Sequence, residues 1–322
     1  MIKVGFMGAG TVAGLHAKAL AEGGAGQLAG VWSRSHANAE RFADQHGGTA
    51  YDSADVLLAQ PDIEAVFILN ASQAHADLAV RTLEAGKHVL IEKPIGVTRA
   101  EVGRIRHAAS ASDRVCMPSH NYIYAPEVRR IHAHLTSGRL GRLNSFWALY
   151  NQRLPPEVGR PDPAMGGLTI HHVYALLYFA GRPAHVSATA SRVHFTNPDT
   201  IDQIMITAGY EDGIIANLWA SFSTDDWSRD PWTVKFKILG ARGTGVASWD
   251  QIKVDEEPGA GQDDAAYWDS FLYTQLYFLN DCVAQGARPL STVDDAYDAA
   301  CVIEAADQAL QLGRRIDVDY RD

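Results

Sequence analysis

The sequence has few cysteines and no basic stretch. Three cysteines, Cys116, Cys282 and Cys301, lie far apart in apolar surroundings, and no Cys-x-x-Cys pair occurs among the 322 residues. This spacing excludes a disulfide framework and a thiolate zinc site, and it is typical of reduced, buried thiols in a cytoplasm. The formal net charge of −10 argues against nucleic acid or an anionic membrane as a partner. The composition leaves small molecules as partners, and no metal site is predicted.

The sequence also lacks a long apolar run. No run approaches the roughly 18 residues of a membrane-spanning helix, and Gly5, Gly8 and Gly10 interrupt the apolar start of the chain. We therefore expect a soluble, cytoplasmic protein without a signal peptide. A composition with 47% hydrophobic and 20% charged residues is globular, and the length allows two domains.

The start of the chain has the pattern of a buried strand, a glycine turn and a helix. Gly8 and Gly10 allow a tight turn and a close approach of the backbone to a pyrophosphate, and Ala13 lets the helix pack against the strand. The phosphates would bind the free N–H groups of Thr11 and Val12 at the helix start. This order predicts dinucleotide binding, and the alternative is a glycine-rich loop in an ordinary α/β domain.

The end of the predicted second strand, which begins near Gln27, indicates the choice of cofactor. An enzyme that prefers NAD would place Asp or Glu there to bind the ribose hydroxyls, whereas this sequence has Ser33, Arg34 and Ser35. Two hydroxyls and a guanidinium suit a 2′-phosphate. NADP is therefore predicted, with NAD less favoured, and the alternative is a solvated arginine at a strand end.

Strands and helices alternate over the first part of the chain. The predicted strands at 65–69 and 88–91 are unbroken apolar runs separated by a helix, which is typical of a parallel sheet covered on both faces. Asn70, Glu92 and Lys93 directly follow these strands. We therefore expect them at the carboxyl edge of the sheet, together with the glycine turn.

The pattern changes in the second half, where strands dominate and Glu211-Asp212-Gly213 forms a predicted hairpin turn. This predicts a large, mostly antiparallel sheet. The predicted strands are 186–193, 203–210, 214–221 and 232–239, and predicted helices at 267–284 and 293–312 follow. The sequence thus predicts an α/β domain with a parallel, doubly wound sheet over 1–122 and an α+β domain over 123–322.

Three motifs together resemble one known family. They are Gly8-x-Gly10-x-x-Ala13-x-x-His16, Ala85-Gly-Lys-His-Val-Leu-Ile-Glu-Lys-Pro94 and Ile238-Leu-Gly-x-x-Gly243. Over nearly its whole length the chain is similar to the Gfo/Idh/MocA family of NAD(P)-dependent oxidoreductases. The resemblance implies an N-terminal Rossmann domain that binds the dinucleotide and a C-terminal domain that binds the substrate. It also implies a homo-oligomer, a dimer or a tetramer, assembled through the open face of the antiparallel sheet.

The resemblance implies roles for residues of the first domain. Lys93 would lie beside the nicotinamide and contact the reacting hydroxyl, where its charge stabilises a developing alkoxide. Glu92 would help to hold the cofactor, Asn70 would stand near the nicotinamide ribose, and His75 would also contact the cofactor. The alternative for Lys93 is a surface lysine that pairs with Glu92.

The resemblance also implies a catalytic histidine at the start of a helix in the second domain, after a Gly-Gly pair. His171 and His172 are the candidates, and ungapped spacing to Gly181 favours His171. An imidazole there would move the substrate proton. At least one of the two histidines is expected to be structural.

One departure from the family pattern bears on the proton transfer. Gly167 stands where the family has an aspartate, and Tyr174 or Asp162 could replace the missing carboxylate. The leading hypothesis is an oxidoreductase that uses NADP and acts on a secondary alcohol or carbonyl of a sugar, polyol or related cyclic compound, with an imine substrate left open. The alternatives are a catalytically silent regulator that binds the dinucleotide, and an enzyme that uses the cofactor transiently for glycoside cleavage.

Overall fold

The computed structural model describes residues 1–158, 164–223, 232–248 and 265–321. Its contacts divide the chain into two compact units. The first unit consists of Met1–Ala125 and Tyr267–Tyr297, and the second consists of Pro126–Ala266 and Asp298–Asp322. Residues Tyr267–Tyr297, here called the C-terminal segment, follow most of the second unit in the sequence but belong to the first unit.

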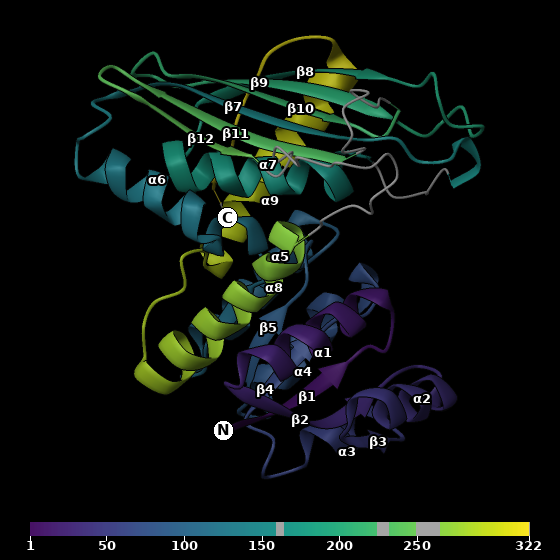
Figure 1. The fold of residues 1–322 in the computed structure, drawn as a ribbon. Helices are drawn as coiled ribbons and strands as arrows, with labels where there is room; N and C mark the ends of the chain where they lie inside the picture. Colours follow the sequence, from purple (N-terminus) through teal and green to yellow (C-terminus); the bar gives the residue numbers. More distant parts are fainter. Residues whose placement is uncertain (159–163, 224–231, 249–264, 322) are drawn as a thin grey trace, which may run out of the picture. The chain divides into compact units, whose positions relative to one another are not determined.

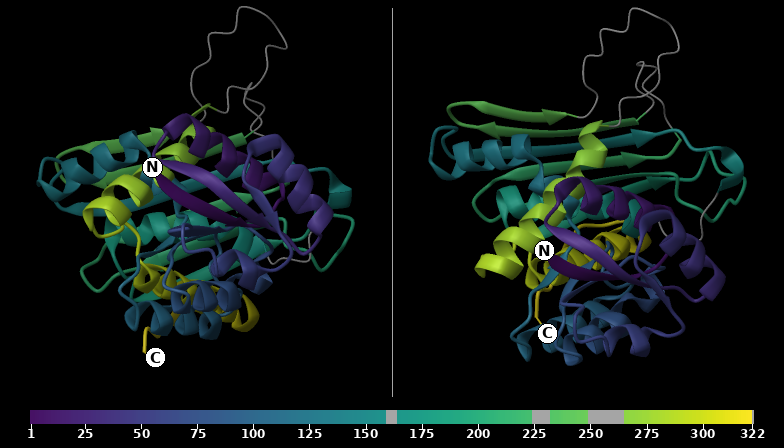
Figure 2. Two further views of the ribbon diagram at one scale, coloured as in Figure 1. Left: turned by 90° about the horizontal axis from the view of Figure 1, so that it is seen from below. Right: turned by 60° about the horizontal axis from the view of Figure 1, so that its bottom comes forward.

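The first unit contains a six-stranded sheet with helices beside it, and Figure 2 shows the purple strands β1 and β2 next to α1 and α2. Its strands are β1 (Ile2–Met7), β2 (Gly26–Trp32), β3 (Thr49–Tyr51), β4 (Ala65–Ile68), β5 (His88–Ile91) and β6 (Cys116–Pro118). Its longer helices are α1 (Thr11–Gly23), α2 (His36–His46), α3 (Ala54–Leu58), α4 (His75–Glu84), α5 (Arg99–Ser110) and most of α8 (Ala265–Leu276), which continues as a π-helix (Tyr277–Val283).

The strand order of this sheet is β3-β2-β1-β4-β5-β6, and all its strand pairs are parallel. The predicted parallel α/β fold is confirmed, although the short strand β3 was not among the predicted elements. The order reverses between β1 and β4. In open α/β sheets, ligands bind outside the carboxyl ends of the strands at such a reversal.

An aromatic cluster forms part of the core of the first unit. The rings of Phe6 on β1 and Phe67 on β4 stack with centroids 5.3 Å apart, and Phe278 meets Phe67 edge-on at 5.8 Å. All three side chains are fully buried. Helix α8 also approaches α1 closely, because a Cβ at Gly23 would lie 3.0 Å from Leu272. The C-terminal segment thus supplies core side chains to the N-terminal sheet.

The second unit is built on a seven-stranded sheet in the order β12-β11-β7-β10-β9-β8-β13. Its strands are β7 (Leu143–Gln152), β8 (His185–Ser191), β9 (Gln203–Gly209), β10 (Ile215–Ser221), β11 (Trp232–Gly240), β12 (Thr244–Ser248) and β13 (Ile316–Asp317). Its helices are α6 (Pro126–Thr136), α7 (Ala164–Ala180) and most of α9 (Val293–Leu312).

The second sheet is mostly antiparallel, as predicted, and only the β7–β10 pair is parallel. The predicted hairpin turn at Glu211-Asp212-Gly213 joins β9 to β10. Helices α6 and α7 lie on one face of the sheet (Figure 1), where Phe146 of β7 stacks on Phe179 of α7 at 5.7 Å. The short strands β12 and β13 at its edges were not predicted.

The other face of this sheet carries exposed apolar side chains. Because side chains alternate along a strand, Trp147 points away from the face that buries Phe146. Trp147 is 50% exposed, Met205 on β9 is 44% exposed and Ile215 on β10 is 58% exposed. None of the described helices is long and apolar enough to cross a membrane.

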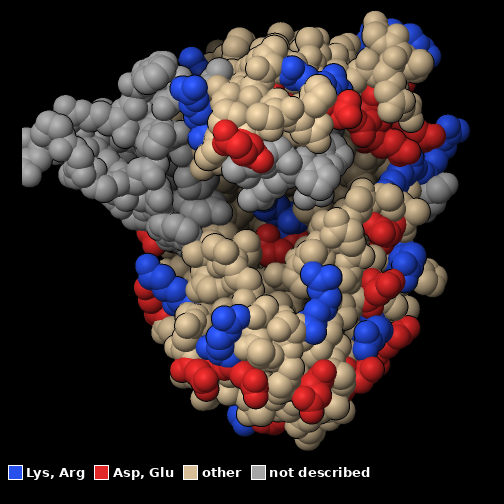
Figure 3. Space-filling view, turned by 90° about the vertical axis from the view of Figure 1, so that its right-hand side faces the viewer, with Lys and Arg blue, Asp and Glu red and all other residues tan. Residues whose placement is uncertain are grey.

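Charged side chains are mixed on the molecular surface. On the face drawn in Figure 3, Lys and Arg side chains alternate with Asp and Glu side chains over the described part of the surface. The basic side chains of these residues form no continuous patch on that face.

Candidate functional site

The glycine turn after β1 has the geometry of a close backbone approach. Gly8 has a φ of 132°, and a Cβ there would lie 2.6 Å from the carbonyl carbon of Leu69, so only glycine fits. Gly10 is exposed, and a Cβ there would meet nothing within 4 Å among the described residues. The turn therefore packs tightly against the end of β4 and borders open space on its outer side.

Helix α1 begins at this open space without a side-chain cap. Its N-cap is Gly10, so no side chain accepts a hydrogen bond from the first amides of the helix. Thr11 and Val12 are exposed, whereas Ala13 is fully buried. Uncapped amides at a helix start suit the phosphates of a dinucleotide, and the buried alanine gives the close helix–strand packing expected of the third small residue.

The end of β2 lies beside the glycine turn, because the Gly8 amide donates a 2.8 Å hydrogen bond to the Trp32 carbonyl. Ser33 is partly exposed and Arg34 is exposed. Among the described residues the Arg34 guanidinium has no hydrogen bond or ion pair, and no carboxylate occurs at positions 33–35. The strand thus ends in groups that can bind an anion.

The loop after β4 contains an unsatisfied acceptor. The Asn70 Oδ1 atom is buried and has no hydrogen-bond partner among the described residues. A buried polar atom without a partner is costly, and a ribose hydroxyl is one group that would satisfy it. This feature fits the predicted position of Asn70 near the nicotinamide ribose.

His75 joins the loop after β4 to the loop after β5. Its side chain is buried, with Nε2 2.8 Å from the Asn70 carbonyl oxygen and Nδ1 2.8 Å from the Pro94 carbonyl oxygen. Both ring nitrogens are thus occupied by the protein backbone. His75 is placed to hold the two loops together, and its predicted contact with the cofactor stays a prediction.

Glu92 and Lys93 follow β5, with a cis peptide bond between Lys93 and Pro94. Lys93 is partly exposed, whereas Glu92 is buried. One oxygen of Glu92, Oε2, accepts the Lys93 backbone N–H at 3.1 Å, and the other, Oε1, lies 3.1 Å from Nε2 of His16. The Glu92 carboxylate therefore bonds to the protein itself, to groups on α1 and in the backbone after β5.

The charge of Glu92 is maintained despite its burial. Burial by itself raises the pKa of this carboxyl, but the hydrogen bond from His16 and the Lys93 ammonium outweigh it and leave the pKa below its usual value. The neighbouring His120, whose Nδ1 lies 2.6 Å from Ser291 Oγ, is held neutral because burial lowers its pKa to about 3. Glu92 thus stays an anion close to a neutral histidine.

Of the two candidate histidines on α7, His172 points into the helix–sheet core. It is fully buried, its ring contacts those of Tyr150 and Phe236, and its Nε2 lies 3.0 Å from the Trp219 carbonyl oxygen. Nδ1 has no partner among the described residues. Burial lowers the pKa of His172 to about 4. It is a neutral, packed side chain at ordinary pH.

His171 has a different environment. Its Nδ1 lies 2.7 Å from the hydroxyl of Tyr174, which is buried one turn further along α7. Gly167 lies within the first turns of α7, where it supplies no carboxylate, and Asp162 lies outside the described residues. Tyr174, one of the two predicted replacements for the missing aspartate, thus contacts His171, and Asp162 stays a prediction.

His16 and Gln275 were not predicted as site residues. The sequence motif contains His16, so a signal for it existed, but no pattern marks Gln275 on α8. Gln275 Nε2 lies 2.9 Å from His16 Nδ1, and both side chains are buried. Through His16 and Gln275, Glu92 is thus linked by hydrogen bonds to α8 in the C-terminal segment.

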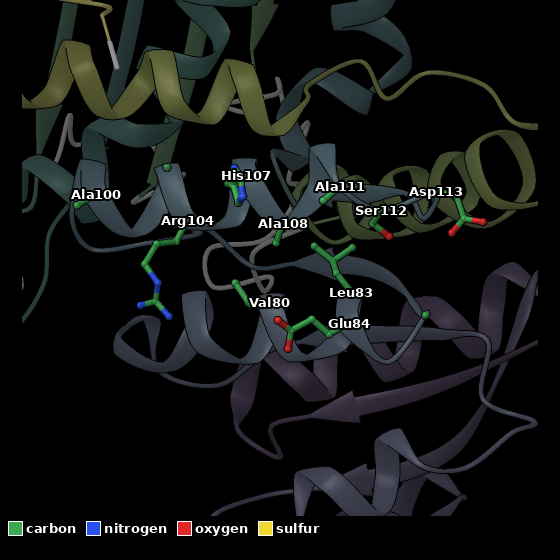
Figure 4. A pocket seen from close by; sticks show the side chains of 12 residues that line it. Val80, Leu83, Glu84, Ala100, Arg104, His107, Ala108, Ala111, Ser112 and Asp113 are labelled. Atoms are coloured by element: carbon green, nitrogen blue, oxygen red, sulfur yellow. The ribbon is translucent and has the colours of Figure 1, made fainter.

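A groove of about 1020 Å³ lies elsewhere in the first unit, between α4 and α5. Figure 4 shows Val80, Leu83 and Glu84 of α4 facing Arg104 and His107 of α5 across it. None of the predicted site residues lines this groove. The described residues also contain no group of His, Cys, Asp and Glu side chains that could hold a metal ion.

Two family models match the chain. One, described as an oxidoreductase family with an NAD-binding Rossmann fold, matches residues 2–120, and the other, a GFO/IDH/MocA C-terminal domain, matches residues 128–246. Together they span most of both units.

Individual relatives and solved structures agree with these matches. An inositol 2-dehydrogenase of Rhizobium meliloti is 25% identical over 338 residues, covering 98% of this chain and 99% of the relative. A D-xylose 1-dehydrogenase (NADP(+)) of Haloferax volcanii is 29% identical over 208 residues, covering 62% of this chain and 63% of the relative. The fold matches that of a levoglucosan dehydrogenase in complex with NADH and L-sorbose, with a TM-score of 0.86, 20% identity and 99% of each chain covered.

Proposed function

The chain belongs to the Gfo/Idh/MocA family of oxidoreductases, and from this premise we propose that it transfers hydride between NADP(H) and a secondary alcohol or carbonyl of a sugar, polyol or related cyclic compound. The observation that carries the proposal is the edge formed by β1, β4 and β5, which are neighbours in the sheet. The glycine turn, Asn70 and Lys93 follow these three strands in that order.

The preference for NADP rests on Arg34. A planar guanidinium at the end of β2, with no partner among the described residues, can form paired hydrogen bonds with a 2′-phosphate. An NAD-preferring site would have a carboxylate there for the ribose hydroxyls, and none is present. One relative, the xylose dehydrogenase of Haloferax volcanii, carries NADP(+) in its name.

We assign one chemical role to Lys93 and one to His171. When bound, the nicotinamide cofactor supplies or accepts the hydride. The Lys93 ammonium stabilises negative charge on the substrate oxygen as the carbonyl forms or is reduced. His171 accepts the hydroxyl proton in oxidation and returns it in reduction, and Tyr174 orients its ring through Nδ1. His172 is unsuited to this role, because its pKa of about 4 makes it a poor base.

Sugars and polyols are proposed as substrates because of the relatives. The inositol dehydrogenase aligns with 98% of this chain, and the xylose dehydrogenase aligns with 62%. Both names describe polyhydroxylated substrates. We place the activity in the cytoplasm, where the three free, buried cysteines would stay reduced.

The direct test is turnover of a substrate panel. The purified protein is mixed with NADPH and ketosugars, or with NADP and polyols, and absorbance at 340 nm is followed, with Lys93→Met as the matched control. Turnover that the Lys93→Met variant loses supports the proposal. Cofactor binding without turnover of any carbonyl or imine contradicts it, and product formation without net change in NADPH would identify glycoside cleavage instead.

We further propose that the open face of the second sheet binds another copy of the chain. Strand register places Trp219 directly opposite Leu149 and Met205, and Trp147 and Ile215 lie on the same face. Contiguous exposed apolar side chains of this kind mark protein interfaces. Light scattering should find a dimer or tetramer for the native chain and a monomer for Ile215→Glu. A native chain that stays monomeric at all concentrations contradicts this assembly.

A further inference from the structure

A chain of three buried side chains leads from helix α8 to the backbone of Lys93. Gln275 of α8 contacts His16 of α1, His16 contacts Glu92 at the end of β5, and Glu92 accepts the Lys93 amide. All of these residues belong to the first unit. None of these three residues is more than 6% exposed.

The orientation of the Gln275 amide follows from its two neighbours. The amide nitrogen lies 2.9 Å from His16 Nδ1 and 3.1 Å from the His16 carbonyl oxygen. A carbonyl oxygen can only accept a hydrogen bond, so the atom beside it must be the NH₂ group. That same NH₂ group can only donate to Nδ1. His16 Nδ1 therefore accepts and carries no proton.

The tautomer of His16 then determines its second hydrogen bond. A neutral imidazole without a proton on Nδ1 carries it on Nε2. Nε2–H faces Oε1 of Glu92 at 3.1 Å and donates to it. Glu92 in turn keeps its negative charge and accepts the Lys93 N–H with Oε2 at 3.1 Å. Every bond in the chain thus has a fixed direction: Gln275 donates to His16, and both His16 and the Lys93 amide donate to Glu92.

We propose that Gln275 is a positioning residue that selects the Nε2–H tautomer of His16, and that His16 and Glu92 thereby fix the backbone from which Lys93 extends. The part of this inference that concerns catalysis rests on the proposed function of Lys93. The part that concerns the tautomer does not, because it depends only on hydrogen bonds within the first unit.

The tautomer is tested by ¹⁵N NMR of the His16 ring in three full-length proteins. The native chain should give the signature of a neutral ring protonated on Nε2. Gln275→Met keeps the length of the side chain but removes the donor, and it should give a mixture of tautomers. Gln275→Glu places a carboxylate at Nδ1, which demands a proton there and should produce the doubly protonated ring. A native ring protonated on Nδ1, or the same spectrum in all three proteins, overturns the inference.

The effect on catalysis is tested with the same variants in the turnover assay. Gln275→Met should lower kcat about tenfold, the scale of one buried hydrogen bond, while the KM for NADPH stays within about twofold because the glycine turn is untouched. Thr274→Val is the matched control, since Thr274 is equally buried on α8 but bonds only to Ser270 of its own helix. It should change stability without changing the His16 spectrum or kcat.

The two arms separate the possible failures. If the native chain turns over no substrate, the proposed function fails, and the NMR arm still decides the tautomer. If the spectra change as expected but Gln275→Met keeps the native kcat and pH profile, the positioning role is refuted.

Discussion

His172 should make the second unit sensitive to acid. In the unfolded chain its pKa is the ordinary 6.5, whereas burial in the fold lowers it to about 4. The folded state therefore resists protonation, and the unfolded state accepts a proton first as the pH falls. The contribution of the neutral His172 to the free energy of unfolding is fully present above pH 6.5. It decreases as the pH falls below 6.5 and is lost below about pH 4.

The magnitude follows from the two pKa values. A gap from 6.5 to about 4 corresponds to about 3 kcal/mol when the titration is complete, and to roughly 2 kcal/mol at pH 5. The control is His172→Gln, whose amide can still donate to the Trp219 carbonyl but does not titrate. The variant should therefore lose about 2 kcal/mol less stability than the native protein between pH 8 and pH 5.

Hydrogen exchange of the α7 amides is the appropriate assay, because it reports the opening free energy of the second unit without requiring that the whole chain unfold in one step. Native and variant proteins are compared at each pH, so the pH dependence of chemical exchange cancels. An equal loss of protection in both proteins between pH 8 and pH 5 would refute the assigned environment of His172.

Three further predictions concern the proposed site. Lys93→Met should lower kcat by about 10²–10³-fold while the NADPH Kd from fluorescence titration stays unchanged, and a variant with native kcat contradicts the role. Arg34→Ala should raise the Kd for NADPH about tenfold and leave that for NADH unchanged, whereas equal losses for both cofactors would exclude a 2′-phosphate contact. Tyr174→Phe removes the hydrogen bond at His171 Nδ1, so kcat/KM should fall about tenfold with a displaced pH profile, and an unaltered profile would remove Tyr174 from the proton transfer.

The sequence was sufficient for the features that depend on local pattern. The parallel strands β4 and β5 appear as short apolar runs, and the hairpin at Asp212 has its own turn residues, so both sheets could be predicted. Short edge strands such as β3 and β13 carry too few residues for a recognisable alternation. The parallel pairing of β7 with β10 depends on contacts across the whole unit.

Residues of the candidate site could be predicted only where they belong to a sequence motif. Adjacent histidines illustrate the limit, because the sequence places His171 and His172 side by side and cannot say which one enters the core. Successive residues on a helix point about 100° apart, so the packing of α7 decides the matter. It buries His172 against Tyr150 and leaves His171 beside Tyr174.

No local sequence pattern predicts that the C-terminal segment packs into the first unit. The predicted helix 267–284 buries Phe271 and Leu279, but helical spacing of apolar residues does not say which core they enter. In the structure, α8 and its continuation place Phe278 against Phe67 of β4 and Gln275 against His16 of α1.

This arrangement makes the N-terminal sheet dependent on residues that follow almost the whole second unit. Ser291 contacts His120 at the end of β6 in the same way that Gln275 contacts His16. Removing the segment would therefore leave the buried side chains of His16 on α1 and His120 after β6 without these partners, which is more costly than losing exposed contacts. The residues that hold the backbone at Lys93 thus come from both ends of the chain. His16 and His120 of the first unit have these hydrogen-bond partners only when residues Tyr267–Tyr297 are packed in that unit.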